Sequence, residues 1–301
     1  MAVLSVFGSA AAQTVGLTRH EGDVKDSYNY WLYSPKETVT NIEVDEFDID
    51  PETGDSVAIV ETGVLLKPLI VFLHGASLCG HNLDRVRTYG TIDAIERGRD
   101  LDAYVIAPQN PGGSWQPAKV MKIVDHVMAT CPIDSTRLYV VGMSLGGYGT
   151  IDMVATYPDR IAAAMAFCGG GTVSDYSGLN QVPLWIVHGT ADRAVGISQS
   201  DAVVNQMKKS DKDTPRLIYD RVPGWNHGSP ARLLYLQDSY DWLMKHSLDD
   251  DNREVATNSI IGSNLIKNAY QGLKNVQRPK ATKKKSRGRK KTAKRRKRRR
   301  R

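Results

Sequence analysis

The sequence predicts an α/β fold with a doubly wound, mainly parallel sheet. Short apolar runs alternate with segments of helical periodicity through residues 27–248, which is the pattern of strands covered by helices. A Gly-Met-Ser-Leu-Gly pentapeptide at residues 142–146 lies where one such strand turns into a helix. Residues 47–62 predict a β-hairpin insertion near the N-terminus, and the C-terminus ends in a Lys/Arg run that predicts a disordered basic tail.

The individual elements follow from local pattern. Residues 27–35 alternate aromatic and polar side chains, as a strand does, and residues 51–55 supply the turn of the hairpin. The apolar runs predicted as further strands are residues 69–73, 103–108, 137–141, 162–167, 185–188 and 216–222. The segments predicted as helices are residues 82–98, 117–129, 147–157, 197–208 and 231–246.

The N-terminal segment is apolar and ends in Ala10-Ala11-Ala12, which resembles a signal-peptide cleavage site. It is too short to span a bilayer and lacks the basic residues that open a signal peptide. We expect residues 1–12 to be a signal peptide whose start lies upstream, so that the protein is secreted or periplasmic. The alternative is a short strand or helix of a cytoplasmic protein.

The charge is distributed unevenly along the chain. We expect the α/β domain over residues 13–248, a linker with a weak helix over 249–277, and the basic tail over 278–301. That tail holds 17 of the 40 Lys and Arg and no acid, so 23 bases face 33 acids elsewhere. A run this dense cannot pack in a core, and it favours binding to an anionic glycan, a lipid surface or nucleic acid.

The three cysteines, Cys79, Cys131 and Cys168, have no metal-ligand spacing. In an exported protein they permit one disulfide and one free thiol, and in a cytoplasmic protein three free thiols. The sequence contains no G-x-G-x-x-G, P-loop or H-E-x-x-H motif. We therefore expect neither a cofactor nor a metal.

Ser144 is the candidate nucleophile. It stands between an apolar strand and a helix that begins with small residues, which is the setting of a nucleophile elbow. The flanking Gly142 and Gly146 suit so tight a turn, because a Cβ would collide with neighbouring backbone. A serine hydroxyl needs a base to become nucleophilic, so a histidine and an acid must follow.

Asp192 and His227 are the candidate acid and base. Each lies on a loop after a predicted strand, 48 residues beyond Ser144 and a further 35 residues on. The order serine, acid, histidine is that of α/β-hydrolases. The rival acids Asp201 and Asp220 lie within a predicted helix and a predicted strand.

Four other histidines are not expected to act as the catalytic base. His74 and His188 each end a strand and are expected to pack loops near the site. His126 and His246 are expected in helices, with surface or structural roles.

Five segments carry a resemblance to a known family. They are residues 73–80 (LHGASLCG), 107–115 (APQNPGGSW), 137–150 (RLYVVGMSLGGYGT), 188–192 (HGTAD) and 223–228 (PGWNHG). With them, residues 27–248 resemble α/β-hydrolases of the bacterial carboxylesterase kind, similar to feruloyl esterases and polyhydroxybutyrate depolymerases and bordering on prolyl-oligopeptidase-like hydrolases.

The resemblance implies hydrolysis of carboxylic esters through an acyl-enzyme on a Ser-His-Asp triad. It implies an oxyanion hole of two backbone N–H groups, from Leu145 and from Ala76, with Ser77 as the alternative to Ala76. Trp115 and Trp225 are expected either to line the substrate site or to pack the loops. The alternatives to an esterase are a prolyl-oligopeptidase-like peptidase, and a non-enzymatic polyanion-binding protein that acts through its tail.

Overall fold

The computed structural model describes residues 16–49, 56–255, 261 and 268–275. Within them, an eight-stranded sheet has the order β1-β2-β6-β5-β7-β8-β9-β10, and β3 and β4 form a separate pair. The strands of the main sheet are β1 (Gly16–His20), β2 (Tyr30–Ser34), β5 (Lys67–Leu73), β6 (Tyr104–Pro108), β7 (Ile133–Met143), β8 (Ala163–Phe167), β9 (Leu184–Gly189) and β10 (Leu217–Val222). The six strands from β6 to β10 in this order run parallel, whereas β2 pairs with β6, and β1 with β2, in the antiparallel sense. The expected mainly parallel sheet is confirmed.

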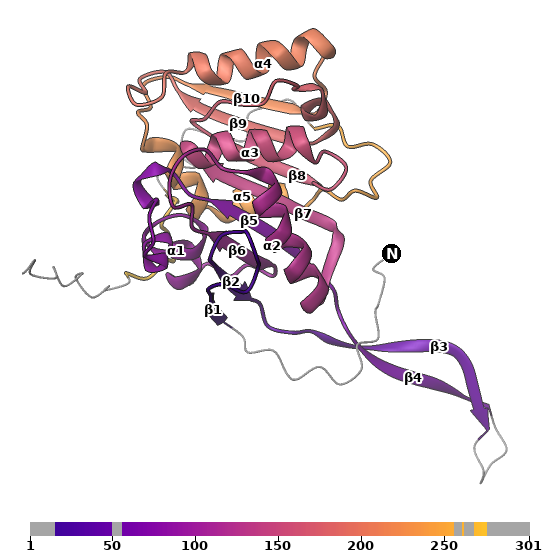
Figure 1. The fold of residues 1–301 in the computed structure, drawn as a ribbon. Helices are drawn as coiled ribbons and strands as arrows, with labels where there is room; N and C mark the ends of the chain where they lie inside the picture. Colours follow the sequence, from indigo (N-terminus) through magenta and orange to yellow (C-terminus); the bar gives the residue numbers. More distant parts are fainter. Residues whose placement is uncertain (1–15, 50–55, 256–260, 262–267, 276–301) are drawn as a thin grey trace, which may run out of the picture.

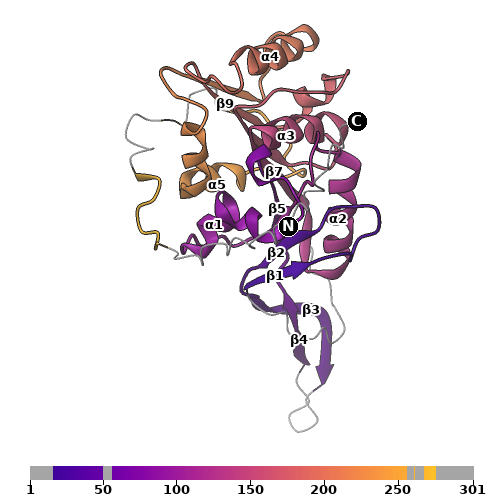
Figure 2. The same cartoon turned by 60° about the vertical axis from the view of Figure 1, so that its left-hand side comes forward.

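Helices cover both faces of this sheet. They are α1 (Thr91–Glu96), α2 (Pro117–Thr130), α3 (Leu145–Thr156), α4 (Ser198–Ser210) and α5 (Gln237–Leu243), with the 3-10 helices η1 (Ala76–Leu78), η2 (Leu83–Thr88), η3 (Ser177–Gln181) and η4 (Ser229–Tyr235). Figures 1 and 2 show α2 and α3 on one face of the sheet and α1 and α5 on the other. The central strand β5 is therefore apolar at every position from Leu69 to Leu73, with alternate side chains entering two core clusters.

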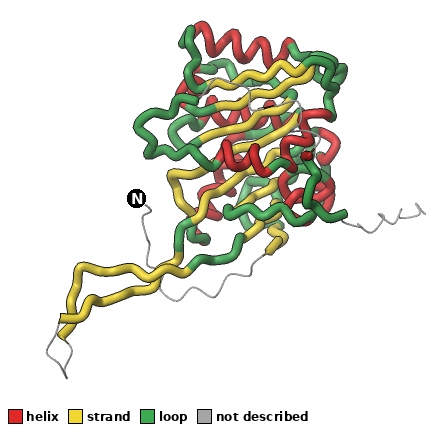
Figure 3. The backbone as a smooth tube through the Cα atoms, turned by 180° about the vertical axis from the view of Figure 1, so that it is seen from behind, coloured by secondary structure: helices red, strands yellow, loops and turns green. Residues whose placement is uncertain are grey.

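The predicted hairpin exists and is longer than expected. Strands β3 (Val39–Ile49) and β4 (Ser56–Val64) pair from Val39 opposite Val64 to Ile49 opposite Ser56. A register shift between Glu43 and Phe47 interrupts the pairing, so no single alternating pattern marks the whole of β3. Figure 3 shows the pair extending away from the body of the protein. The expected turn at residues 51–55 lies outside the described residues.

Two predicted helices are each divided in two. Residues 82–98 form η2 and α1, separated at Gly90, whose φ of 90° lies in the left-handed region. A Cβ at this glycine would overlap the ring of Phe72, so the chain passes the core here without a side chain. Residues 231–246 form η4 and α5, separated by the extended backbone of Leu236, and His246 lies beyond α5 rather than within a helix.

The chain continues to pack on the domain beyond residue 248. Arg253 donates hydrogen bonds to the carbonyls of Ile161 and Ala162, and Val255 and Ala269 are buried. These contacts show that the described part of the expected linker packs against the domain. Residues 1–12, residues 278–301 and half of the expected weak helix at 260–273, namely 260 and 262–267, lie outside the described residues. Of the helices described, none combines the length and apolarity needed to cross a membrane.

Candidate active site

The candidate site lies at the carboxyl edge of the parallel strands. Ser144 follows β7, Asp192 lies three residues beyond β9, and His227 lies five residues beyond β10. Ala76 lies on the loop after β5, the strand that pairs with β7 on its other side. Because the carboxyl ends of parallel strands share one edge, loops far apart in the sequence converge there.

The backbone at Ser144 makes the sharp turn that the sequence predicts. Its φ of 58° and ψ of −121° lie outside the regions that L-residues ordinarily adopt, and its N–H donates to the carbonyl of Phe167 at 2.8 Å. A Cβ at Gly142 would overlap the carbonyl of Gly146, and one at Gly146 would overlap the carbonyl of Leu73. Strand, turn and helix therefore approach one another only because both positions are glycine.

Ser144, His227 and Asp192 form a continuous hydrogen-bonded chain. The distance from Ser144 Oγ to His227 Nε2 is 2.9 Å, and that from His227 Nδ1 to Asp192 Oδ2 is 2.7 Å. An ionised carboxylate only accepts, so Nδ1 carries the hydrogen and Nε2 is free to accept from the serine hydroxyl. The His227 side chain is 28% exposed, so a substrate can reach it, whereas the Asp192 side chain has no solvent exposure.

The Asp192 carboxylate is held from both oxygens. Oδ1 accepts the backbone N–H groups of Ala194 and Val195, each at 2.9 Å, while Oδ2 faces His227. Burial by itself raises the pKa of Asp192, but the hydrogen bonds from Val195, His227 and Ala194 outweigh it and hold the pKa below its usual value. The acid is therefore a permanent anion beside the imidazole at neutral pH.

Leu145 and Ala76, the residues expected to supply the oxyanion hole, each begin a helix. Leu145 opens α3 and Ala76 opens η1, and the first N–H groups of a helix have no partner within that helix. The loop that carries Ala76 lies against the serine, since a Cβ placed on Gly75 would be 3.3 Å from the Cβ of Ser144. The Gly75 N–H is directed to the hydroxyl of Tyr89 at 2.7 Å, which fixes the loop.

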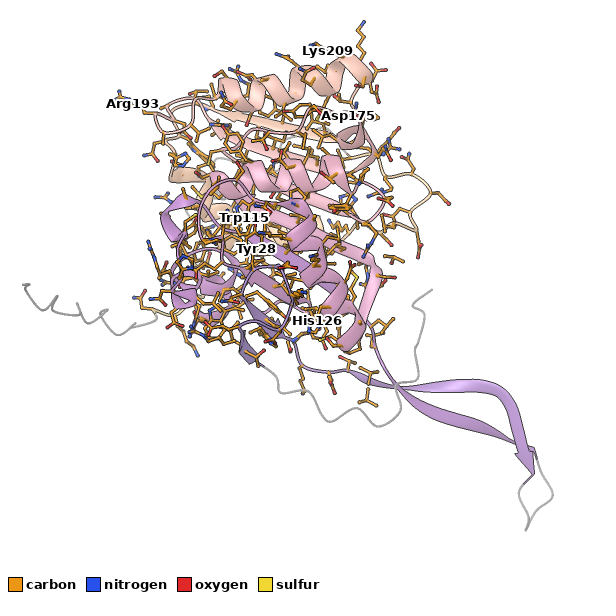
Figure 4. All side chains as sticks on the ribbon, viewed as in Figure 1. Tyr28, Trp115, His126, Asp175, Arg193 and Lys209 are labelled. Atoms are coloured by element: carbon orange, nitrogen blue, oxygen red, sulfur yellow. The ribbon has the colours of Figure 1, made fainter. Side chains whose placement is uncertain are left out.

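The two candidate substrate-binding tryptophans differ in exposure. Trp115 is 3% exposed, donates its indole N–H to the carbonyl of His74, and packs edge-on against Tyr28. Figure 4 shows Trp115 and Tyr28 together within the body of the molecule. Trp115 thus packs a loop. Trp225 is only partly buried, and its carbonyl accepts from the N–H of Ala191 in the loop that carries Asp192.

The rival acids have other partners. Asp220 accepts the indole N–H of Trp185 at 2.8 Å, and Asp201 accepts the hydroxyl of Tyr219 at 2.8 Å and pairs with Arg221. These contacts tie Asp220 of β10 to β9, and Asp201 of α4 to β10. Neither carboxylate hydrogen-bonds Ser144 or His227.

Three of the remaining histidines are distinguished by their surroundings. His74 is fully buried, with Nδ1 directed to the carbonyl of Gly75 and Nε2 accepting the N–H of Asn110. His188 is also fully buried and contacts Asp192, with 3.3 Å between Nε2 and Oδ2. His126 lies on α2 and is partly exposed (Figure 4).

The sequence did not predict that Cys168, which follows β8, lies at the candidate site. Its Sγ donates to the carbonyl of His227 at 3.5 Å, and its φ of 40° is unusual for a non-glycine residue. Cys168, Asp192 and His227 bring a sulfur, an oxygen and a nitrogen within 4.8 Å of one another, as metal ligands do. Burial raises the pKa of the Cys168 thiol to about 12, and Asp192 and His227 already hydrogen-bond each other at 2.7 Å. The three groups therefore suit a hydrogen-bonded site better than a metal site.

A cavity of about 280 Å³ lies elsewhere, between the end of η4 and the start of α5. It is lined by Arg99, Leu236, Gln237, Asp238, Asn268 and Gln271. None of the residues of the candidate site lines it. The candidate site is therefore located by its hydrogen-bonded side chains, and this cavity is a separate feature.

Known proteins resemble the chain in sequence and in fold. No family model matches it. It is 28% identical over 147 residues to poly(3-hydroxyalkanoate) depolymerase C of Paucimonas lemoignei, covering 42% of this chain and 34% of the relative. It is 23% identical over 243 residues to feruloyl esterase B of Talaromyces stipitatus, covering 75% and 62%.

A solved structure described as a thermostable esterase matches with a TM-score of 0.50 and 25% identity, covering 69% of this chain and 63% of that one. The chain thus spans between about a third and two thirds of these curated relatives. Together with the strand order, these likenesses give it the α/β-hydrolase fold.

Proposed function

We propose that the protein is a serine hydrolase that cleaves carboxylic esters through an acyl-enzyme. The observation that carries the proposal is the chain of hydrogen bonds from Ser144 Oγ through His227 to the buried Asp192. The alternative of a purely structural serine does not account for a strained backbone at Ser144, because strain of this kind concentrates at functional sites.

The geometry supports a two-step reaction. His227 Nε2 takes the proton of Ser144 as its Oγ attacks the ester carbonyl, and Asp192 stabilises the imidazolium that forms. The same proton passes from Nε2 to the leaving alcohol, which departs and leaves an ester on Ser144. Water then attacks that acyl group, giving its proton to His227, and the acid leaves when Ser144 Oγ regains the proton.

The negative charge of each tetrahedral intermediate falls on the former carbonyl oxygen. We propose that the N–H groups of Leu145 and Ala76 receive it, with Ser77 as the alternative to Ala76. Both Leu145 and Ala76 begin a helix, so their N–H groups have no partner within that helix before substrate binds. Donors placed in this way contribute about 3 kcal/mol each to transition-state stabilisation.

The substrate class proposed is an ester of an acetyl or aromatic acid carried on a polysaccharide. The sequence similarity to a feruloyl esterase supports this class. Trp225 is the tryptophan that remains available to contact an acyl group, because Trp115 is committed to packing. The triad alone does not distinguish ester from peptide substrates, so a prolyl-oligopeptidase-like peptidase is the rival activity.

A substrate panel separates the two. We expect turnover of p-nitrophenyl acetate, p-nitrophenyl butyrate and methyl ferulate, and none of a proline p-nitroanilide, by the wild-type protein. The matched control is Ser144→Ala, which should be inactive on all four. Cleavage of the anilide with no turnover of any ester would replace the esterase proposal with the peptidase.

We also propose that residues 278–301 attach the enzyme to an anionic glycan or lipid surface outside the cytoplasm. Seventeen positive charges in 24 residues support binding of polyanions, nucleic acid included, with little dependence on their structure. The apolar N-terminus ending in Ala10-Ala11-Ala12 supports export, and in an exported protein nucleic acid is the least available of these partners.

A further inference from the structure

His188 is a buried histidine to which the proposed mechanism assigns no role. It is the next-to-last residue of β9, four positions before Asp192, and its side chain has no solvent exposure. Its Nε2 lies 2.9 Å from the carbonyl oxygen of Val195 and 3.3 Å from Asp192 Oδ2. Its Nδ1 lies 2.7 Å from the hydroxyl of Ser200 on α4.

The partners of Nε2 decide where the hydrogen of the ring lies. A carbonyl oxygen and an ionised carboxylate both only accept hydrogen bonds. A bare nitrogen facing two such acceptors within a buried site would be strongly unfavourable, so Nε2 carries a hydrogen. Asp192 Oδ2 therefore faces two imidazole N–H groups, one from His227 at 2.7 Å and one from His188 at 3.3 Å.

The other side of the ring is fixed as well. Ser200 is 2% exposed, and its hydroxyl, which has a single hydrogen, lies 2.7 Å from His188 Nδ1 and 2.9 Å from the carbonyl oxygen of Gly169. Ser200 belongs to α4, and Gly169 follows β8. These contacts hold the imidazole in one rotation, with Nε2 directed at the Asp192 loop.

His188 also closes that loop upon itself. Val195 donates its N–H to Asp192 Oδ1 and accepts from His188 Nε2 through its carbonyl. Val195 thus helps to position the Asp192 carboxylate, and His188 in turn positions Val195. A small rotation of Asp192 would move Oδ2 out of line with His227 Nδ1.

We infer that His188 is a positioning residue for the proposed catalytic acid, acting through its Nε2–H on Asp192 and Val195. The inference rests on the proposed hydrolase function. The partners of His188 are Ser200, Val195 and Asp192, and it hydrogen-bonds neither Ser144 nor His227, so it acts only through Asp192 and the loop. Losing its Nε2–H should lower kcat, because the imidazolium is stabilised less well, and should leave KM nearly unchanged.

Two substitutions separate this role from simple packing. A glutamine amide reaches about as far as Nε2 of histidine, and an asparagine amide about as far as Nδ1. His188→Gln therefore keeps an amide N–H toward Asp192, whereas the amide of His188→Asn lies near Ser200 and offers no donor to Asp192. His126, a partly exposed residue of α2, supplies a matched control, because His126→Asn makes the same substitution away from the site.

We expect His188→Asn to lower kcat on p-nitrophenyl acetate by about 10- to 100-fold with KM changed less than about threefold. His188→Gln and His126→Asn should stay within about threefold of wild type. In an Asp192→Asn background, His188→Asn should add less than about a twofold further loss, since residues that act through one another are not additive.

Wild-type kcat in His188→Asn, equal losses in the asparagine and glutamine variants, or a full multiplicative loss on top of Asp192→Asn would overturn the inference. If ester hydrolysis survives Ser144→Ala, the proposed function fails instead. Should His188→Asn not fold, ¹⁵N-histidine NMR of the wild-type protein decides, with His188 assigned by His188→Gln. An Nε2 bearing hydrogen is expected, and a hydrogen on Nδ1 alone would overturn the inference.

Discussion

His227 Nε2 lies 2.9 Å from Ser144 Oγ, although 83 residues separate the two in the chain. The serine sits on a turn fixed by β7 and α3, whereas the histidine sits on a loop after β10. A turn and a loop far apart in the chain thus meet at a hydrogen bond with the geometry of a nucleophile and its base.

Replacing Ser144 by alanine should reduce ester hydrolysis by about 10⁵-fold or more, because the nucleophile and its proton are removed together. The substitution removes one oxygen from a partly exposed side chain, so the fold should persist. Initial rates on p-nitrophenyl acetate and the circular dichroism of the variant check both statements. A folded Ser144→Ala protein with near wild-type turnover would refute the assignment.

Asp192→Asn should lower kcat by about 10⁴-fold, because an amide favours the wrong tautomer of His227. The matched control is Asp220→Asn, since Asp220 contacts the indole of Trp185 and not the histidine. That control should retain kcat within a few-fold. An active Asp192→Asn variant together with an inactive Asp220→Asn variant would show that the acid is misassigned.

Stability should fall as the pH falls from about 6.5 to about 4, because of His74. Burial holds the pKa of His74 at about 4, and the hydrogen bond from Asn110 occupies Nε2 in the neutral ring. A free imidazole titrates near pH 6.5, so within this window the unfolded chain binds a proton that the native protein does not, and unfolding is favoured. The lowering of the His74 pKa from 6.5 to about 4 corresponds to about 3 kcal/mol of unfolding free energy.

The check is urea unfolding at several pH values for wild type and His74→Gln, whose amide oxygen can still accept from Asn110. The variant should lose less stability than wild type between pH 7 and pH 4, by roughly the 3 kcal/mol above. Parallel curves for the two proteins would mean that His74 takes up its proton in the folded state.

Gly146→Ala should destabilise the protein severely, because the added methyl would overlap the carbonyl of Leu73 and backbone cannot yield as a side chain does. Overpacking of this kind costs about 1–3 kcal/mol or more. Gly196→Ala is the control, since its Cβ would come no closer than 3.4 Å to the Ser198 hydroxyl. Melting temperatures compare the two, and equal values would contradict the packing described at the elbow.

Deleting residues 278–301 should leave kcat/KM on p-nitrophenyl acetate within a few-fold and abolish retention on heparin or anionic vesicles at low salt. The reason is that 17 of the chain's 40 basic residues lie there, and attraction between exposed charges is screened by salt. Loss of activity or failure to fold on truncation would mean that the tail belongs to the domain.

Local patterns in the sequence predict much of the fold and identify Ser144, Asp192 and His227 as candidate site residues. The apolar strand runs and the glycines of the elbow are local signals, and the order of strands then places their loops on one edge. Strand β1 escapes prediction because Gly16–His20 holds few apolar residues and is defined by its pairing with β2.

The features that the sequence did not predict depend on tertiary contacts. The break at Gly90 is set by the ring of Phe72, a residue of another element. The burial of Trp115 depends on Tyr28 and His74, and no local pattern shows it. His188 and Asp192 are only four residues apart, but the orientation of the His188 ring depends on its contacts with Val195 and with Ser200 of α4.

The central claim is that Ser144 is an activated nucleophile. The most direct measurement is labelling of the native protein with a fluorophosphonate, followed by mass spectrometry of the digested peptides. Stoichiometric modification of Ser144 in the wild-type protein is expected, with no labelling of folded Ser144→Ala. A wild-type protein that is folded yet unlabelled, or labelled at another residue with Ser144 intact, would contradict it.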